Sequence, residues 1–85
     1  MTADMPMTPE YREMRRAALE SRLARATRRL ELAAEMLLGA IEAEAVGMDC
    51  ATQRTAAAQL ERAATSEIAA VHAALAELDA ADPST

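Results

Sequence analysis

The chain has 85 residues, a net charge of −5 and an apolar fraction of 52%. A chain this short forms at most one domain with a shallow core, so an enclosed active site is not expected. Glutamates interrupt the most apolar stretch and the N-terminus lacks basic and apolar leader regions, so neither a membrane span nor a signal peptide is expected.

The first predicted helix begins at the segment TPEY, residues 8–11. Thr8 is a favourable N-cap, and Pro9 suits the first helical position because its missing N–H has no intrahelical partner there. Glu10 places a negative charge at the positive end of the helix dipole. Residues 1–8 are expected to form a flexible tail that leads into this helix.

The two glycines of the chain are predicted to have different roles. Gly39 lies where the apolar periodicity continues on both sides, so the helix is expected to run through it at a cost of about 1 kcal/mol relative to alanine. Gly47 is followed by Asp49, a favourable N-cap, and glycine is the preferred residue just beyond a helix C-terminus. The turn is therefore expected at Gly47.

The predicted fold is all-α, with one helix at 9–46, a turn at 47–49, a second helix at 50–80 and a frayed C-terminus at 81–85. Cys50 would be the first residue of the second helix. It is the only cysteine, so it cannot form an internal disulfide, which favours a reducing, cytoplasmic location. A helix of the first length spans roughly 55 Å and needs a partner along it.

Apolar residues recur with a heptad rhythm in both helices, which is typical of a coiled coil. The first stripe consists of Leu19, Leu23, Ala26, Leu30, Ala33, Leu37 and Ala40, and the second of Ala57, Leu60, Ala64, Ile68, Val71, Leu75 and Leu78. Folding about residue 48 pairs Leu37 with Leu60, Leu30 with Ile68, Leu23 with Val71 and Leu75, and Leu19 with Leu78. The sequence therefore predicts an antiparallel helical hairpin.

A two-helix hairpin covers only one side of each helix, so completion of a four-helix bundle by dimerisation or by a helical partner is expected. In this register Pro9 to Ala18 would project beyond the second helix. A second, weaker apolar strip follows Met14, Leu32 and Met36 on the first helix. The candidate partner-binding residues are therefore Tyr11, Met14, Ala18, Leu32 and Met36.

Arginine is concentrated at the N-terminal end of the chain. Residues 1–30 carry a net charge of +3 and residues 31–85 one of −8. The candidates for electrostatic contact are Arg12, Arg15, Arg16, Arg22, Arg25 and Arg29. Four of them (15, 22, 25 and 29) share one flank that could follow phosphates. The favoured interpretation is that they pair with acids on a neighbouring helix.

Residues that could carry chemistry are few. The sequence has no phosphate-binding glycine loop, no Ser/His/Asp set and no Cys-x-x-Cys pair. His72 has no Glu or His at helical metal-site spacing, and Glu31, Glu35 and Glu42 lack a Glu-x-x-His motif to complete a carboxylate-bridged site. Catalysis, a metal, a cofactor and a small-molecule substrate are therefore not expected.

The stretch AALESRLARATRRLEL, residues 17–32, resembles the first helix of the small co-chaperones of type III secretion needle subunits. This bacterial family has chains of similar length, acidity and low aromatic content. The resemblance implies a helical hairpin that docks on a larger tetratricopeptide-type chaperone. This chain departs from the pattern in its longer helices and its short turn VGMDC, and the resemblance assigns no functional residue.

Taken together, these patterns indicate a non-enzymatic protein–protein interaction module. A helical hairpin would associate with itself, or act as an adaptor or co-chaperone for a helical partner. Methionine suits such a surface because its side chain is flexible and polarizable. The alternative is a hairpin RNA-binding regulator that uses the arginine flank of the first helix.

Overall fold

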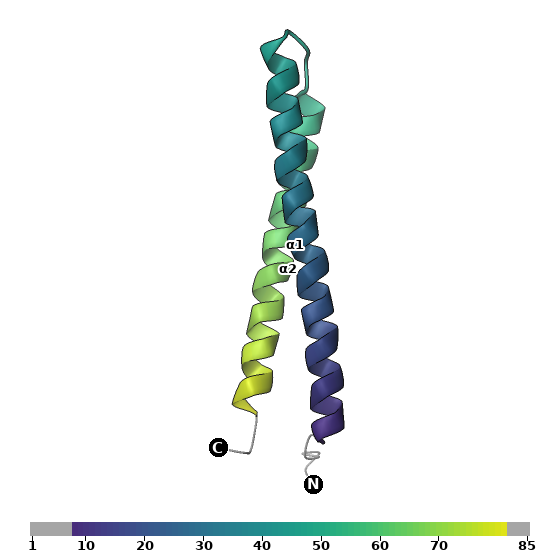
Figure 1. The fold of residues 1–85 in the computed structure, drawn as a ribbon. Coiled ribbons are helices and arrows are strands. Elements are labelled where there is room, and N and C mark those ends of the chain that lie inside the picture. Colours follow the sequence, from purple (N-terminus) through teal and green to yellow (C-terminus); the bar gives the residue numbers. More distant parts are fainter. Residues whose placement is uncertain (1–7, 82–85) are drawn as a thin grey trace.

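The computed structural model describes residues 8–81 as two long helices, α1 (Pro9–Ala45) and α2 (Ala51–Ala80). The helices lie side by side and antiparallel, with the turn at one end and both termini at the other (Figure 1). The all-α helical hairpin predicted from the sequence is thereby confirmed. The expected tail and the frayed C-terminus fall mainly on residues 1–7 and 82–85, which lie outside the described residues.

The start of α1 follows from local chemistry. Thr8 has an extended backbone, and its hydroxyl accepts a hydrogen bond from the Tyr11 amide at 3.1 Å. Pro9 occupies the first helical turn and Glu10 supplies its negative charge. The cap therefore satisfies one of the amides that would otherwise lack a partner, as the sequence predicted.

Gly47 ends α1 through a Schellman motif. The amide of Gly47 donates to the carbonyl of Glu44 at 3.0 Å, and the amide of Met48 donates to Ala43 at 3.1 Å. This geometry requires the left-handed region at Gly47, where φ is +95°. Gly39 remains within α1, so both predicted roles of the glycines are confirmed.

The start of α2 corrects the predicted boundary by one residue. Cys50 is the N-cap and Ala51 the first helical residue, whereas Asp49 was expected to be the cap and Cys50 the first residue. The Asp49 carboxylate nevertheless accepts the Ala51 amide at 3.1 Å. Because an Asx side chain can bond an amide two residues on, Asp49 caps α2 from one position further out.

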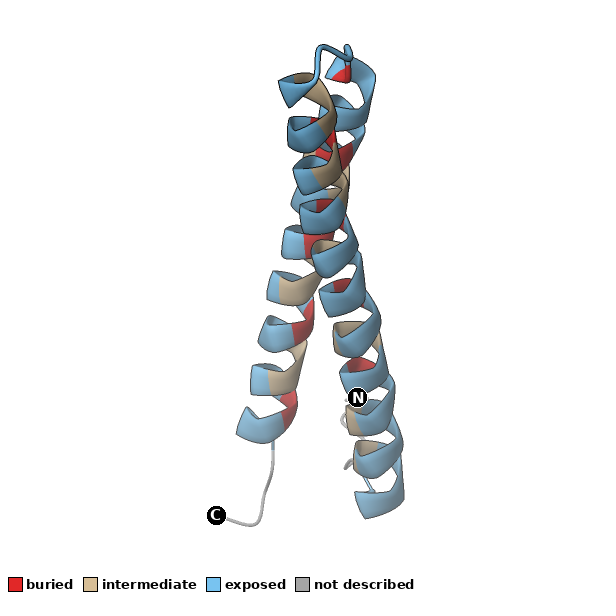
Figure 2. Ribbon diagram, turned by 45° about the horizontal axis from the view of Figure 1, so that its top comes forward, coloured by how far each residue is buried: buried red, intermediate tan, exposed pale blue. Residues whose placement is uncertain are grey.

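One buried line of residues, spaced by seven, joins the two helices (Figure 2). In α1 it consists of Leu19, Ala26, Ala33 and Ala40, and with α2 it continues as Cys50, Ala57, Ala64, Val71 and Leu78. Alanine fills most of these positions, so the backbones can approach closely. A strict seven-residue repeat is the packing rule of a coiled coil.

The buried line of residues between the helices, which we call the seam, does not include the leucines near the turn that were expected in the core. Leu19 packs with Val71 and Leu78 at the open end, and Leu23 and Leu75 pack against this cluster, as predicted. Nearer the turn the predicted register is wrong, because Leu30 and Leu37 line a groove with Arg54, Ala57 and Glu61 and not with Leu60 or Ile68. Leu37 was expected in the core but is 37% exposed. Where alanines let the backbones meet, no space is left between them for a leucine, so Leu37 lies on the flank.

The expected basic overhang is wrong in its extent. The Arg12 guanidinium donates to the carbonyl of Ala81 at 3.5 Å, and Arg16 forms an ion pair with Asp79. These contacts show that α2 accompanies α1 as far as Arg12. The predicted register set α2 too far towards the turn, since Leu37 lies beside Arg54 and not beside Leu60. At the open end Tyr11 therefore lies beside Ala81.

We expect opposite effects from alanine at the two glycines. Gly47→Ala should destabilise the hairpin by about 1 kcal/mol, because a Cβ disfavours the left-handed backbone. Gly39→Ala should stabilise it by up to about 1 kcal/mol, since a Cβ there would lie 3.8 Å from Gln53 Nε2, an ordinary contact. Urea unfolding followed by circular dichroism measures both; equal shifts would contradict this assignment.

Candidate interaction surface

An apolar groove runs along one face of the hairpin near the turn. Its volume is ≈ 320 Å³, and α1 contributes Leu30, Ala33, Ala34 and Leu37, whereas α2 contributes Arg54, Ala57, Ala58 and Glu61. Leucines form the α1 wall, alanines form the floor, and the only charged groups are Arg54 and Glu61 on the α2 side. The groove is therefore suited to receive apolar side chains between two charged positions.

The α1 wall of the groove continues into exposed apolar side chains. Leu38 is 56% exposed and Ile41 is 47% exposed. Leu38 follows Ala34 by four residues and Ile41 follows Leu37 by four, which places them along one side of α1. We call Leu37, Leu38 and Ile41 the turn-side patch. Patch and groove together form a continuous apolar surface that the hairpin itself does not cover.

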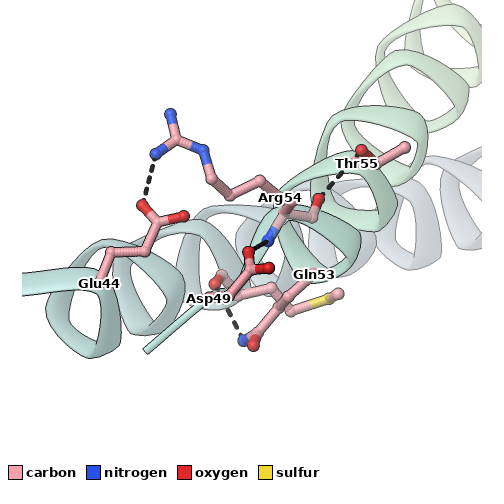
Figure 3. Close-up of polar contacts among 7 residues, drawn as sticks. Glu44, Asp49, Gln53, Arg54 and Thr55 are labelled. Atoms are coloured by element: carbon pink, nitrogen blue, oxygen red, sulfur yellow. Dashed lines mark hydrogen bonds and ion pairs between the residues drawn. The ribbon is translucent and has the colours of Figure 1, made fainter. Parts of the chain in front are cut away.

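Polar contacts fix the two helices to each other beside this surface (Figure 3). Arg54 donates to the Glu44 carboxylate at 2.7 Å across the turn end of the hairpin. On the other flank, Gln53 donates through Nε2 to the carbonyl of Met36 at 3.4 Å. The groove therefore lies between elements that are joined on both flanks of the seam.

The predicted apolar strip on α1 is not continuous. Met14 is 68% exposed and Leu32 is 49% exposed, but 18 residues separate them, which is about 27 Å along a helix. Arg28, Arg29, Glu31 and Glu35 surround Leu32. Ala18 is exposed, and Met36 is half-buried beside α2. The structure therefore separates Met14 from the other two members of the strip.

Tyr11, which is 51% exposed, lies at the open end of the hairpin. Its side chain lines a shallow depression with Arg15 and with Ala74, Glu77, Leu78 and Ala81 of α2. Residues of both helices line this depression, so Tyr11 lies beside α2 and is not part of a free overhang. Tyr11 is not among the residues that line the apolar groove near the turn.

The predicted arginine flank faces an acid on α2. Arg22 donates through Nε to Glu67 at 2.9 Å. This hydrogen bond is the main reason that the pKa of Glu67 lies below its ordinary value, and the charges of Arg22, Arg29 and Arg25 add to the effect. The same pair raises the pKa of Arg22. The interpretation that the arginines pair with acids of a neighbouring helix is thus confirmed for Arg22.

The remaining arginines contribute in different ways. Arg16 pairs with Asp79, as described above, and Arg12 contacts the end of α2. Arg25 donates to the Ser21 hydroxyl at 3.0 Å within α1. Arg29 is exposed, and Arg15 lies beside Glu77 in the depression at the open end. Acids of α2 therefore lie beside Arg22 and Arg15, whereas Arg25 and Arg29 form no ion pair with a described residue.

The residues considered for chemistry remain apart. His72 is exposed on α2, and Cys50 is buried at the turn end of the seam as a free thiol. Within residues 8–81, no three His, Cys, Asp or Glu side chains gather where they could hold a metal ion. Neither described helix has a stretch long and apolar enough to cross a membrane.

Comparisons with known proteins give no relative. No family model matches the sequence, no curated protein matches it, and no solved structure matches its fold.

Sequence reasoning missed the turn-side patch because it assigned Leu37 to the core and gave Leu38 and Ile41 no role. A signal was present in the alanines. Ala26, Ala33 and Ala40 recur at intervals of seven, and so do Ala57 and Ala64. Small residues at that spacing form the closest contact, so larger apolar residues near them must lie outside it.

We expect the Arg22–Glu67 pair to make the free energy of unfolding of the hairpin depend on pH. The folded pKa of Glu67 is lowered, whereas in the unfolded chain it is near the ordinary value of about 4.3. As the pH falls, the unfolded state therefore binds the proton first, and the stabilisation present at neutral pH is lost as the pH passes the folded pKa.

Glu67→Gln should accordingly lower the urea midpoint at pH 7 and lower it less near pH 3. Glu42→Gln is the matched control, because Glu42 is exposed and forms no ion pair with a described residue. A Glu67→Gln effect of the same size at both pH values would show that the charge pair does not stabilise the hairpin.

Proposed function

We propose that the chain is a non-enzymatic protein–protein interaction module that builds a four-helix bundle through its apolar groove and turn-side patch. The hairpin supplies two helices, and a second copy or a helical partner supplies the others. In this proposal the module acts in the cytoplasm, where its single thiol stays reduced. The arginine flank then serves chiefly to hold α1 and α2 in register.

The distribution of exposed apolar side chains carries this proposal. Eight large apolar residues in the described part of the chain are exposed, and five of them lie between residues 37 and 48. Scattered exposed leucines are ordinary, but a gathered apolar surface marks a site for another macromolecule. The neighbouring groove gives such a partner a concave, largely apolar contact.

The form of the surface favours a helix as the partner. The two antiparallel helices form the walls of a groove with alanines between them, and the apolar face of an amphipathic helix fits a groove of this kind. Burial of a leucine yields about 1.5 to 3 kcal/mol, so covering the turn-side patch would add several kcal/mol to a small hairpin.

The resemblance to co-chaperones of type III secretion needle subunits is consistent with this proposal, because those proteins are helical hairpins that dock on a helical chaperone. The proposal stands without the resemblance, since it derives from the groove. RNA binding through the arginine flank is the competing function. It predicts binding that weakens steeply with salt and requires Arg22, Arg25 and Arg29.

We expect Leu37→Glu and Ile41→Glu to abolish association, because each places a charge in the surface that the partner must dehydrate. The measurements are light scattering of the purified chain at micromolar concentration, and affinity capture from the native host with mass spectrometry. Circular dichroism establishes that the variants keep the helical hairpin.

Met14→Glu and Leu32→Glu are the matched controls, since both side chains are exposed but lie outside the groove. They should leave self-association and the captured proteins unchanged. Loss of association in these two variants with retention in Leu37→Glu would place the interface on the strip predicted from the sequence and would refute the groove.

A further inference from the structure

We infer that the occupant of the apolar groove is a second copy of this chain, placed antiparallel around a two-fold axis at Ala57 and Ala58. This inference rests on the proposed interaction function and names the partner. It derives from the charges at the two ends of the groove, together with the position of the exposed apolar residues.

Arg54 and Glu61 make the groove complementary to itself. Both line the groove from α2, and they lie seven residues apart, so they occupy equivalent positions on the same side of the helix. Reversing the direction of α2 about the midpoint between them exchanges their places. Arg54 of one copy then meets Glu61 of the partner subunit, and because the interface is isologous, the pair forms twice.

The existing contacts leave both groups available. The Arg54 side chain is half exposed, and its bond to Glu44 uses one of the five N–H donors of a guanidinium. Glu61 is exposed and forms no ion pair with a described residue. A second carboxylate can therefore approach Arg54 without breaking its contact with Glu44.

A dimer formed about this axis also covers the exposed apolar surface. It sets the two α1 helices antiparallel, with Leu30 of each copy at the level of the segment 37–41 of the partner subunit. The exposed residues Val46 and Met48 at the turn reach the level of the half-buried Ile68 on the opposite α2. The overlap of the two turn halves thus covers the region where exposed apolar side chains are gathered.

The other two-fold arrangement fits less well. With the axis along the hairpin, α2 of one copy would face α1 of the partner at the same level. Glu61 would then lie against the wall of Leu30 and Leu37, and no cation lies between these leucines on the groove side of α1. A carboxylate buried against leucine without a partner is costly, so the antiparallel arrangement is favoured.

Charge exchange tests this inference. Arg54→Glu alone and Glu61→Arg alone each replace two attractive pairs with two repulsive ones, so each should raise the dimer Kd about tenfold or more. The double variant R54E/E61R restores both pairs and should return the Kd to within about threefold of the original. An equimolar mixture of the two single variants should form the heterodimer in preference to either homodimer.

The measurements are sedimentation equilibrium for the Kd and native mass spectrometry for the mixture, at low and at high salt. The differences should shrink at high salt, because these charges lie at the surface. Glu44→Gln is the control for loss of the bond within one copy, and Glu42→Arg is the control for charge reversal elsewhere. Neither should change the Kd more than about threefold.

Two results would overturn the inference. Equal weakening in the single and double variants would show that Arg54 and Glu61 do not meet across the interface. A wild-type chain that is monomeric up to about 100 µM would exclude a second copy as the occupant. If Leu37→Glu then still abolished capture of a host protein, the proposed interaction function would stand with a different partner.

Discussion

Close contact between two backbones at alanine determines the form of this protein. Ala26, Ala33 and Ala40 of α1 meet the line that contains Ala57 and Ala64 of α2. Small side chains let the helices approach, and the space that would hold leucines in an ordinary coiled coil disappears. Larger apolar residues of this half are displaced to the flank. The exposed patch is therefore a direct consequence of the packing that forms the hairpin.

The two ends of the hairpin differ for the same reason. At the open end Leu19, Val71 and Leu78 occupy the central line and form a compact cluster, so the hairpin satisfies its own apolar residues there. Near the turn the central line is mostly alanine, and Leu37 and Leu38 remain exposed. Stability is thus concentrated at one end and the surface available for association at the other.

Charge has separate roles along the chain. On one flank Arg22 and Glu67 join the helices, and Arg16 and Asp79 do so at the open end. Surface pairs of this kind contribute little energy but fix orientation and register. Arg54 is different, because it lies at the groove itself. The proposed pairing with a second copy assigns that residue a role in choosing the partner as well as in holding the turn.

Much of the fold could be predicted because local chemistry specifies it. The cap at Thr8 and the left-handed turn at Gly47 each depend on a few adjacent residues. The apolar repeat also predicted the cluster of Leu19 with Val71 and Leu78 at the open end, but it did not place Leu37 beside Arg54. Asp49 shows the limit of such rules, since its side chain caps α2 from one residue further out than expected.

The sequence by itself determined two helices, the site of the turn and the heptad stripes along which the helices pack, because these depend on backbone preference and on periodicity. Only the tertiary structure decided which apolar residues the seam would bury. That outcome depends on how closely the axes approach, which no single helix specifies. It placed Leu37 outside the core, brought Arg12 to the end of α2, and located the candidate interface at the turn end of the hairpin.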